Sequence, residues 1–177
     1  MYHIKDDSRI LKSANLIRDG LVKCLKNKPI SEISVSEIAN ASKVSRATFY
    51  RIFDSPIDAL KYICDTLAQE VVNEHTKHHS GSREEFVLNT LRMWMQRSDF
   101  LEAVMRSRRP DILQDAFARF SERYYSDMER KFAKEEIDYV NAFFAATMCS
   151  ILYVWAVRGK KETPEQLLEV FKKLSLC

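Results

Sequence analysis

The chain has 177 residues, 46% of them apolar and 30% charged, with only 3 glycines and 4 prolines. This is a globular composition poor in turn residues, so it favours long helices over many short strands. Residues 1–53 carry ten Lys and Arg against five Asp and Glu, whereas residues 54–177 carry eighteen against twenty, so the basic charge lies in the first third. That distribution suits phosphate contact there, although chance asymmetry of solvated faces would look the same.

The first third predicts three helices. Apolar side chains recur at steps of three and four in the first, and Pro29 ends it. Ser34 with Glu37 forms a capping box that opens the second, and Ser45 caps the third. The predicted segments are a helix over 8–26, a helix over 35–41, a turn at 42–43 and a helix over 46–52.

The remaining chain predicts six more helices and no strand. Ser55 precedes Pro56 at a helix start, Ser82 with Glu85 is a second capping box, and Gly159 ends the most apolar helix. The predicted helices cover about 56–75, 82–97, 99–106, 111–134, 136–158 and a last one from 164. The fold class is therefore all-α, with about nine helices.

The four cysteines are dispersed, and no pair has CxxC spacing, so neither a zinc site nor a disulfide framework is expected. Three of them lie among apolar helical residues, as buried free thiols do, which fits a reducing, cytoplasmic setting. No secretory signal is expected, because the first residues lack a charged start followed by an apolar run. The apolar stretch 142–157 is about one turn short of a bilayer span, so a buried helix and no membrane contact are expected.

Residues 34–53 have the layout of a helix-turn-helix, which places one helix in the DNA major groove. Ala39 is the small residue that the crossing of the two helices needs. The apolar residues that would hold the second helix are Ile38, Val44, Phe49 and Phe53. An amphipathic helix pair inside an ordinary bundle would show the same pattern in isolation.

The segment 33–60 resembles the DNA-binding domain of tetracycline-repressor-type (TetR) regulators. The matching positions are Ile38-Ala39, Val44-Ser45, Thr48-Phe49-Tyr50 and Phe53. The resemblance implies an N-terminal DNA-binding head over 1–53 and a helical ligand-sensing and dimerisation domain over 54–177.

The resemblance also implies which residues meet DNA: Ser34, Ser36, Ser45, Arg46, Ala47, Thr48, Tyr50 and Arg51. Arg46 would read guanine or contact a phosphate, since its planar fork suits both. Tyr50 would bond a phosphate through its hydroxyl. Arg51 would contact a phosphate or form a surface ion pair, and Ser34 would touch a phosphate or serve only as a cap.

Two positions depart from the family pattern. Many members have glycine in the turn where this chain has Lys43, and a left-handed lysine there costs about 1 kcal/mol. Many also have a DNA-contacting lysine at the start of the fourth helix, where this chain has Pro56. One phosphate contact is therefore expected to be missing, with a shallower salt dependence of binding.

The resemblance implies an effector cavity and a dimer interface in the second domain. The candidate pocket residues are Met93, Trp94, Phe100, Met105, Phe117, Phe120 and Tyr124, although large apolar residues at helical spacing usually form core. The candidate interface residues on the last two helices are Val140, Phe144, Met148, Ile151, Leu152, Trp155, Leu168 and Phe171, with burial inside one subunit as the alternative.

Other clusters carry weaker signals. His75 and His79 could share a helical face near His78, but solvated loop histidines are the default, and no metal or other cofactor is expected. No catalytic motif is present, so no enzyme activity is expected. The basic run 106–109 could meet an anionic ligand or DNA, or form a solvated corner between helices.

Together these features predict a DNA-binding transcriptional regulator. It would bind a pseudo-palindromic operator as a homodimer, act as a repressor by family habit, and be released by a small-molecule effector. The alternative is a helical ligand-binding or adaptor protein that has lost specific DNA binding.

Overall fold

The computed structural model describes residues 2–3, 8–77, 82–126 and 133–174, leaving aside the side chains of 75–77, 121–126 and 134. Within these residues the protein is all-α, as predicted, with nine α-helices, two short 3-10 helices and no strand. The elements are α1 (Ser8–Leu25), η1 (Ile30–Glu32), α2 (Val35–Ser42), α3 (Arg46–Ile52), α4 (Pro56–Lys77), α5 (Arg83–Gln96), α6 (Ser98–Arg106), α7 (Pro110–Ser126), η2 (Lys134–Glu136), α8 (Ile137–Val157) and α9 (Pro164–Leu174).

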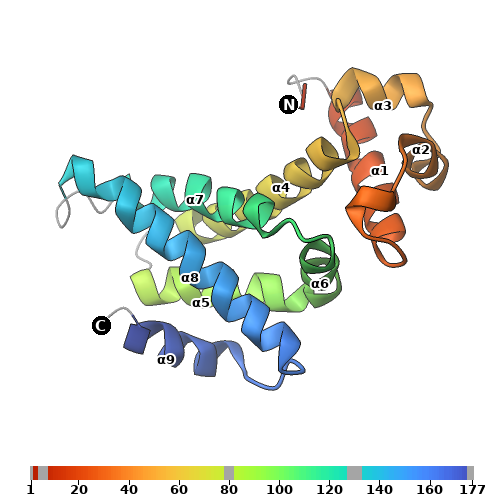
Figure 1. Ribbon diagram of the computed structural model, residues 1–177. Helices are drawn as coiled ribbons and strands as arrows, with labels where there is room; N and C mark the ends of the chain where they lie inside the picture. The colour runs from red at the N-terminus through yellow and green to blue at the C-terminus, as the bar shows by residue number, and fades with distance from the viewer. Residues whose placement is uncertain (1, 4–7, 78–81, 127–132, 175–177) are drawn as a thin grey trace.

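Helices α1, α2 and α3 form a small head at one end of the molecule (Figure 1). The apolar stripe of α1 ends in Leu21 and Leu25, which are buried in one cluster with Ile38, Phe49 and Ile52. Because these side chains come from three short helices, the head depends on tertiary packing more than on helix propensity.

The backbones of α1 and α2 touch at Gly20. A Cβ atom there would lie 2.7 Å from the Cβ of Ser42, closer than side-chain carbons approach. The Ser42 hydroxyl turns back and donates to the carbonyl of Ile38 at 2.6 Å. Lys43 then ends α2 in the left-handed conformation, with φ of 57°, as the sequence predicted. Ala39, the expected small residue, is buried.

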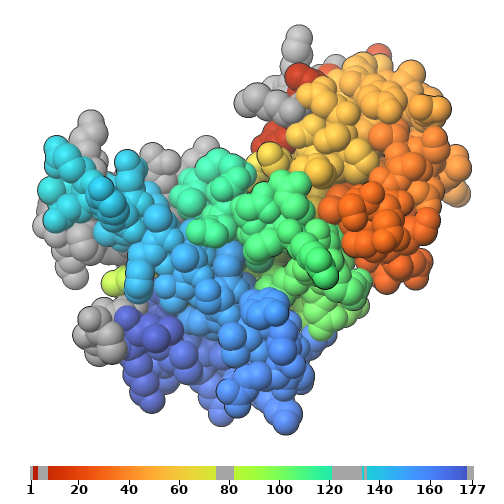
Figure 2. All heavy atoms as spheres, in the orientation of Figure 1, coloured from red at the N-terminus to blue at the C-terminus, as the bar shows by residue number. Residues whose placement is uncertain are grey.

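Helix α4 runs from the head into the body, where α7 and α5 pack against it, with α8 packed on α7 and α9 on α5 (Figure 1). The body core is aromatic: Trp94 and Phe117 lie 5.4 Å apart between ring centroids, and Phe144 lies 6.0 Å from Phe171. Figure 2 shows the head projecting from this body, with atoms of the α6 to α7 region against those of α1 and η1. The head is thus joined to the body both through α4 and through that side contact.

One helix ends earlier than predicted. The sequence pattern suggested a helix over 111–134, whereas α7 is described to Ser126 and residue 134 belongs to η2. Residues 127–132 lie outside the described part. Helices α7 and α8 pack side by side (Figure 1). The backbone N–H of Ala133 donates to Glu136 Oε2 at 2.8 Å where η2 begins.

Helix α8 is long and apolar enough to cross a membrane by length and composition, which corrects the expectation of a stretch one turn too short. Its most apolar window has a mean hydropathy of 1.7 and is 39% buried. Core helices of soluble proteins pass the same test. One side of α8, including Phe144, Met148 and Leu152, is buried in the body core.

Candidate nucleic-acid interface

The register of α3 separates an inner face from an outer face. Phe49 and Ile52 are fully buried, so the residues between them point outward. Arg46, Ala47 and Arg51 are exposed, and Tyr50 is 50% exposed as a residue. Because these four residues are exposed, no other element of the described part of the chain covers the outer face of α3.

Most serines predicted to meet DNA have hydrogen bonds within the head. Ser34 Oγ accepts from the backbone N–H of Glu37 at 3.2 Å and donates to the Glu37 carboxylate at 2.8 Å. Ser45 Oγ accepts from the backbone N–H of Thr48 at 3.0 Å and bonds its hydroxyl at 2.9 Å. Ser36 is exposed on α2. The caps therefore occupy Ser34 and Ser45, which agrees with the capping role considered for Ser34.

Electrostatics fix the start of α2. Lys28 Nζ donates to Glu37 Oε1 at 2.6 Å, and the Ser34 N–H donates to Glu37 Oε2 at 2.9 Å. These bonds, the one from Lys28 first, lower the pKa of Glu37 to about 2. The negative charge at the helix N-terminus stays in place at neutral pH, where it is favourable for the helix dipole.

The N-terminal residues bind the end of α3, a feature for which the sequence gave no signal. The backbone N–H of His3 donates to the carbonyl of Ile52 at 2.8 Å. The Tyr2 hydroxyl donates to Asp65 Oδ2 on α4 at 2.8 Å. Arg119 on α7 pairs with the other carboxylate oxygen of Asp65. The N-terminal segment, α4 and α7 therefore meet at the carboxylate of Asp65.

The predicted pocket residues lie in several places. Trp94, Phe100 and Phe117 are buried in the body core, and Met93 and Phe120 are half-buried against it. The cavity among Trp94, Phe117 and their neighbours measures only 10 Å³, about the space of one water molecule. The side chain of the sixth residue, Tyr124, is outside the described part. The seventh, Met105, lines a different and larger cavity.

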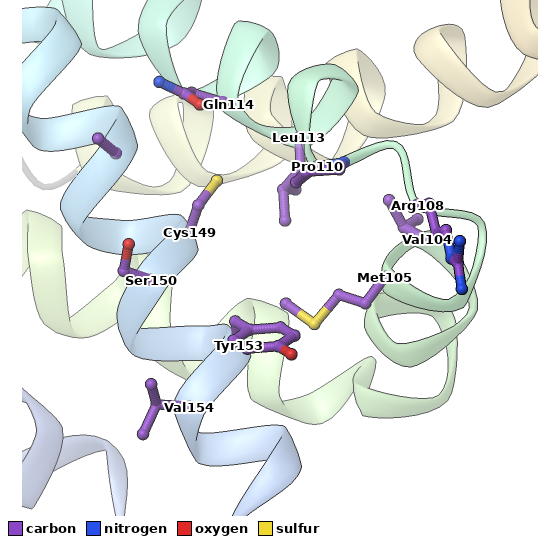
Figure 3. A pocket seen from close by; sticks show the side chains of 11 residues that line it. Val104, Met105, Arg108, Pro110, Leu113, Gln114, Cys149, Ser150, Tyr153 and Val154 are labelled. Carbon is purple, nitrogen blue, oxygen red and sulfur yellow. The ribbon is translucent and has the colours of Figure 1, made fainter.

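That larger cavity is an open groove of 710 Å³ between the outer face of α8 and the junction of α6 with α7 (Figure 3). Its eleven lining residues are Val104, Met105, Arg108, Pro110, Leu113, Gln114, Ala146, Cys149, Ser150, Tyr153 and Val154. In Figure 3 the side chains of Met105, Leu113, Cys149 and Tyr153 surround the open space. Burial raises the pKa of the Cys149 thiol to about 12, so this thiol stays protonated at neutral pH.

The junction of α6 and α7 also holds the head. Ser107 Oγ accepts from the backbone N–H of Ile30 at 3.0 Å, and the Arg106 guanidinium donates to the carbonyl of Leu25 at 3.1 Å. Both partners lie at the end of α1 or in η1. The next residue, Arg108, lines the groove in a left-handed conformation, with φ of 53°. The basic run 106–109 therefore lies between the groove and the head.

Of the predicted dimer residues, all but one are buried in their own subunit. Val140 is half-buried; Phe144, Met148, Ile151, Leu152, Trp155, Leu168 and Phe171 are buried. They follow the alternative considered from the sequence, burial inside one subunit. Helix α8 is apolar around much of its circumference, so its sequence pattern alone could not predict which of its apolar residues face the core of the subunit. The exposed large apolar residues of α8 and α9 are Tyr139, Phe143, Tyr153, Val154, Val157, Val170 and Leu174.

The described residues contain no group of three or more His, Cys, Asp or Glu that could hold a metal ion. His78, His79 and the side chain of His75 lie outside that part of the chain. The histidine cluster predicted from the sequence is therefore not tested by the structure. Cys24, Cys64 and Cys149 are free thiols; Cys64 is buried and the other two half-buried.

Comparison with known proteins shows which sequence family this chain matches. Residues 81–176 match a TetR-type sequence family described as "Transcriptional regulator C-terminal region". No curated protein sequence matches the chain.

Several solved structures share the fold. Lin0861 from Listeria innocua superimposes with a TM-score of 0.82 at 20% identity, covering 98% of this chain and 94% of that one. A TetR transcriptional regulator from Streptococcus agalactiae 2603V gives 0.68 at 22% identity, covering 94% of each chain. The dihydroxyacetone kinase operon activator DhaS gives 0.65 at 20% identity, covering 94% and 95%. At these identities the likeness concerns the fold.

Proposed function

The chain belongs to the TetR family of transcriptional regulators, and from that membership we propose that it binds an operator through α3 and represses transcription from it. The observation that carries the proposal is the outer face of α3, where Arg46, Ala47, Tyr50 and Arg51 are exposed beside one another on a capped, rigidly seated helix. Side chains of these types supply the phosphate and base contacts of a recognition helix.

The roles divide along the helix. Arg46 stands in its first turn, where recognition helices meet base edges, and it reads guanine or holds a phosphate. Tyr50 and Arg51 contact the sugar–phosphate backbone. Ser36 on α2 supplies a further phosphate contact. The hydroxyls of Ser34, Ser45 and Thr48 already form hydrogen bonds in the caps of α2 and α3. They contact the DNA only through the lone pairs or protons that these bonds do not use. Residues 1–53 form the DNA-binding unit and 54–177 the sensing and dimerising unit.

The test is a binding titration with operator DNA selected from a pool of random duplexes. Arg46→Ala and Tyr50→Phe should each weaken binding at least fivefold, the loss of one charged or one neutral contact. Leu16→Ala, which changes an exposed residue on α1, is the control and should bind like the unchanged protein. Unchanged affinity in both α3 variants, with folded protein, would contradict the proposal.

The protein acts as a homodimer joined through the outer faces of α8 and α9. Val154, Val157, Val170 and Leu174 are between 44% and 68% exposed there, an unusual concentration of apolar surface for a subunit on its own. A groove of 280 Å³ between the two helices, lined partly by Val154 and Val170, offers a seat for side chains of a second copy. Two such pairs make a four-helix interface.

Regulation follows from a small effector that favours subunits in which the two recognition helices no longer fit one side of a duplex. The solved structure DhaS is described as an operon activator, so activation is the alternative to repression. The two are distinguished by deleting the gene for this protein and measuring expression of a reporter joined to its operator. Raised expression supports repression, and lowered expression supports activation. We place the protein in the cytoplasm, where its DNA is.

A second candidate function is a helical adaptor that has lost specific DNA binding. The observation that favours it is Pro56, which stands at the start of α4 without the charge or amide donor of a lysine there. A selection that yields no preferred sequence at moderate salt would support the adaptor and contradict the regulator.

A further inference from the structure

Residues 2 and 3, which we call the strap, lie across the joint between α3 and α4. The backbone N–H of His3 donates to the carbonyl of Ile52, the last residue of α3, at 2.8 Å. Nε2 of the His3 ring lies 3.1 Å from Oδ1 of Asp54, which stands between α3 and α4. These two contacts attach the strap to the C-terminal end of α3.

The Tyr2 side chain continues the strap onto α4. Its ring packs edge-on against Phe53 and Tyr62, with 6.5 and 5.4 Å between ring centroids. Its hydroxyl donates to Oδ2 of Asp65 at 2.8 Å. Because Phe53 ends α3 while Tyr62 and Asp65 lie in α4, the ring holds α3 and the first part of α4 together as one unit.

Asp65 passes this attachment on to the body. Its side chain is only 11% exposed, and Arg119 of α7 pairs with its other carboxylate oxygen. Both partners matter to a carboxylate removed from water in this way, because loss of either leaves a buried charge incompletely paired. The head, Tyr2, Asp65, Arg119 and α7 therefore form a series of linked contacts, and the series is broken when any one of them is lost.

The head has a second attachment at a different place. At the end of α1 and in η1, the carbonyl of Leu25 accepts from Arg106 at 3.1 Å, and the N–H of Ile30 donates to Ser107 Oγ at 3.0 Å. In Figure 1 the start of the chain is drawn above the first part of α4, and α6 below it. A head held only by α4 and one side contact would still be able to turn about them, and the strap removes this freedom.

We propose that the strap fixes the angle of the head relative to the body and thereby sets which spacing between operator half-sites the dimer accepts. This rests on the proposed function, in which the body carries the dimer contact and the head carries α3. The angle between head and body then sets the separation of the two copies of α3. Tyr2, Asp65 and Arg119 are positioning residues, which act on α3 and do not touch the DNA.

The geometry of the duplex makes this angle decisive. One base pair added between the half-sites moves one of them by about 3.4 Å along the axis and turns it by about a tenth of a helical turn. Heads held at one angle cannot follow both changes, so one half-site is lost together with the gain from binding both at once. Heads released from the strap can follow them, at the expense of selectivity.

A purely stabilising role for the strap makes a different prediction. Loss of the strap would then lower the fraction of folded protein and leave the geometry of the folded dimer unchanged. Val87→Ala reproduces that case, because Val87 is fully buried on α5 and its truncation weakens the body core without touching the strap. The distance between head and body, and the preference for operator spacing, therefore separate the two roles.

The first experiment measures the position of the head without DNA, so it is independent of the proposed function. Genetically encoded spin labels replace Ala47 on α3 and Lys161 after α8, both exposed, and labelled subunits are diluted in unlabelled protein. Pulsed electron paramagnetic resonance should give one narrow distance distribution for this parent protein and for Val87→Ala. Tyr2→Phe and Arg119→Gln should broaden it, and Arg119→Lys, which keeps the charge beside Asp65, should restore most of the narrow distribution. Narrow distributions in both strap variants would overturn the proposal.

The second experiment measures affinity for the selected operator and for versions with one base pair added or removed between the half-sites. The unchanged protein should lose about tenfold or more on either change. Tyr2→Phe and Arg119→Gln should lose about threefold or less, while their affinity for a duplex with a single half-site stays that of the unchanged protein. The double variant should be no more tolerant than the more tolerant single one, because both act through Asp65.

Arg92→Gln is the matched control for the arginine variant. Arg92 pairs with Glu165 within the body, at 48% exposure against 51% for Arg119, so its loss should leave the spacing preference unchanged. Broadened distances with an unchanged spacing preference would keep the strap and overturn its part in operator choice. Failure of every form to bind DNA would contradict the proposed function, whereas the distance measurement would still decide whether the strap holds the head.

Discussion

The Tyr2 hydroxyl donates to Asp65 across 63 positions of sequence, at 2.8 Å, and so fastens the start of the chain to the middle of α4. The Tyr2 ring also packs edge-on against Tyr62, with 5.4 Å between centroids. Burial, and then the bond to Asp65, raises the pKa of Tyr2 to about 12. Because Asp65 also pairs with Arg119 of α7, one carboxylate joins the N-terminus, α4 and the body.

Replacing Tyr2 by phenylalanine should therefore destabilise the fold. The variant keeps the ring packing and loses one hydrogen bond to a buried carboxylate, a loss of about 1 kcal/mol in the free energy of unfolding measured in urea. Tyr139→Phe is the matched control, since that tyrosine is 78% exposed and should change nothing. A stability loss in the control as large as in Tyr2→Phe would show that the bond to Asp65 is not the cause.

Lys43 occupies a left-handed position at the end of α2, which glycine adopts without a penalty. Lys43→Gly should raise the free energy of unfolding by about 1 kcal/mol. Lys43→Ala removes the same charge but keeps the strain, so it should give no such gain. Both variants can be compared by urea denaturation, and a gain shared by both would assign the effect to the charge instead.

Gly20 sits inside α1, where alanine would ordinarily favour the helix. Here the added methyl group would lie 2.7 Å from Ser42 Cβ and 2.8 Å from its backbone nitrogen, which cannot move aside without shifting α2. Gly20→Ala should thus destabilise the head by about 1–3 kcal/mol, as overpacking does. Thermal unfolding followed by circular dichroism measures this. Combination with Ser42→Gly removes one of the two contacts and should recover part of the loss.

Because the pKa of Glu37 is lowered in the folded protein, part of the free energy of unfolding depends on pH. Its pKa is about 2 in the folded head against 4.5 without the partners, so the contribution is present above pH 4.5 and is lost as the pH falls through 2. Glu37→Gln should be less stable than the unchanged protein at pH 7, and the difference should shrink below pH 4. Glu32→Gln, at an exposed position in η1, is the control for general charge effects. A difference independent of pH would contradict the assignment.

The proposed interface can be broken without touching the core of one subunit. Val157 and Leu174 are 68% and 48% exposed, so Val157→Lys and Leu174→Lys should stay folded and lose dimerisation in sedimentation equilibrium. Leu16→Lys changes an equally apolar exposed residue on α1 and should remain dimeric. Intact dimers in both interface variants would place the contact elsewhere.

Local signals in the sequence were sufficient for the helices of the head. Ser34 with Glu37, Ser45, and the stop before Pro56 act within a few residues of each other, so they determine where α2 and α3 begin and end. The same holds for Thr163 with Gln166, which bond each other reciprocally at the start of α9. The family pattern around α3 is also local, so the helix and the residues that point outward from it could be predicted from the sequence.

Only the tertiary structure decided which side of each apolar helix faces the core and which distant residues meet. Helix α8 is apolar on nearly all sides, and the neighbours that select its inner face lie on α7 and α5, far away in sequence. The bonds from Tyr2 to Asp65 and from Ile30 to Ser107 span 63 and 77 positions, and no periodicity encodes such contacts. Capping and helix period are properties of a short segment, whereas a groove or a joint between head and body exists only once several segments have packed together.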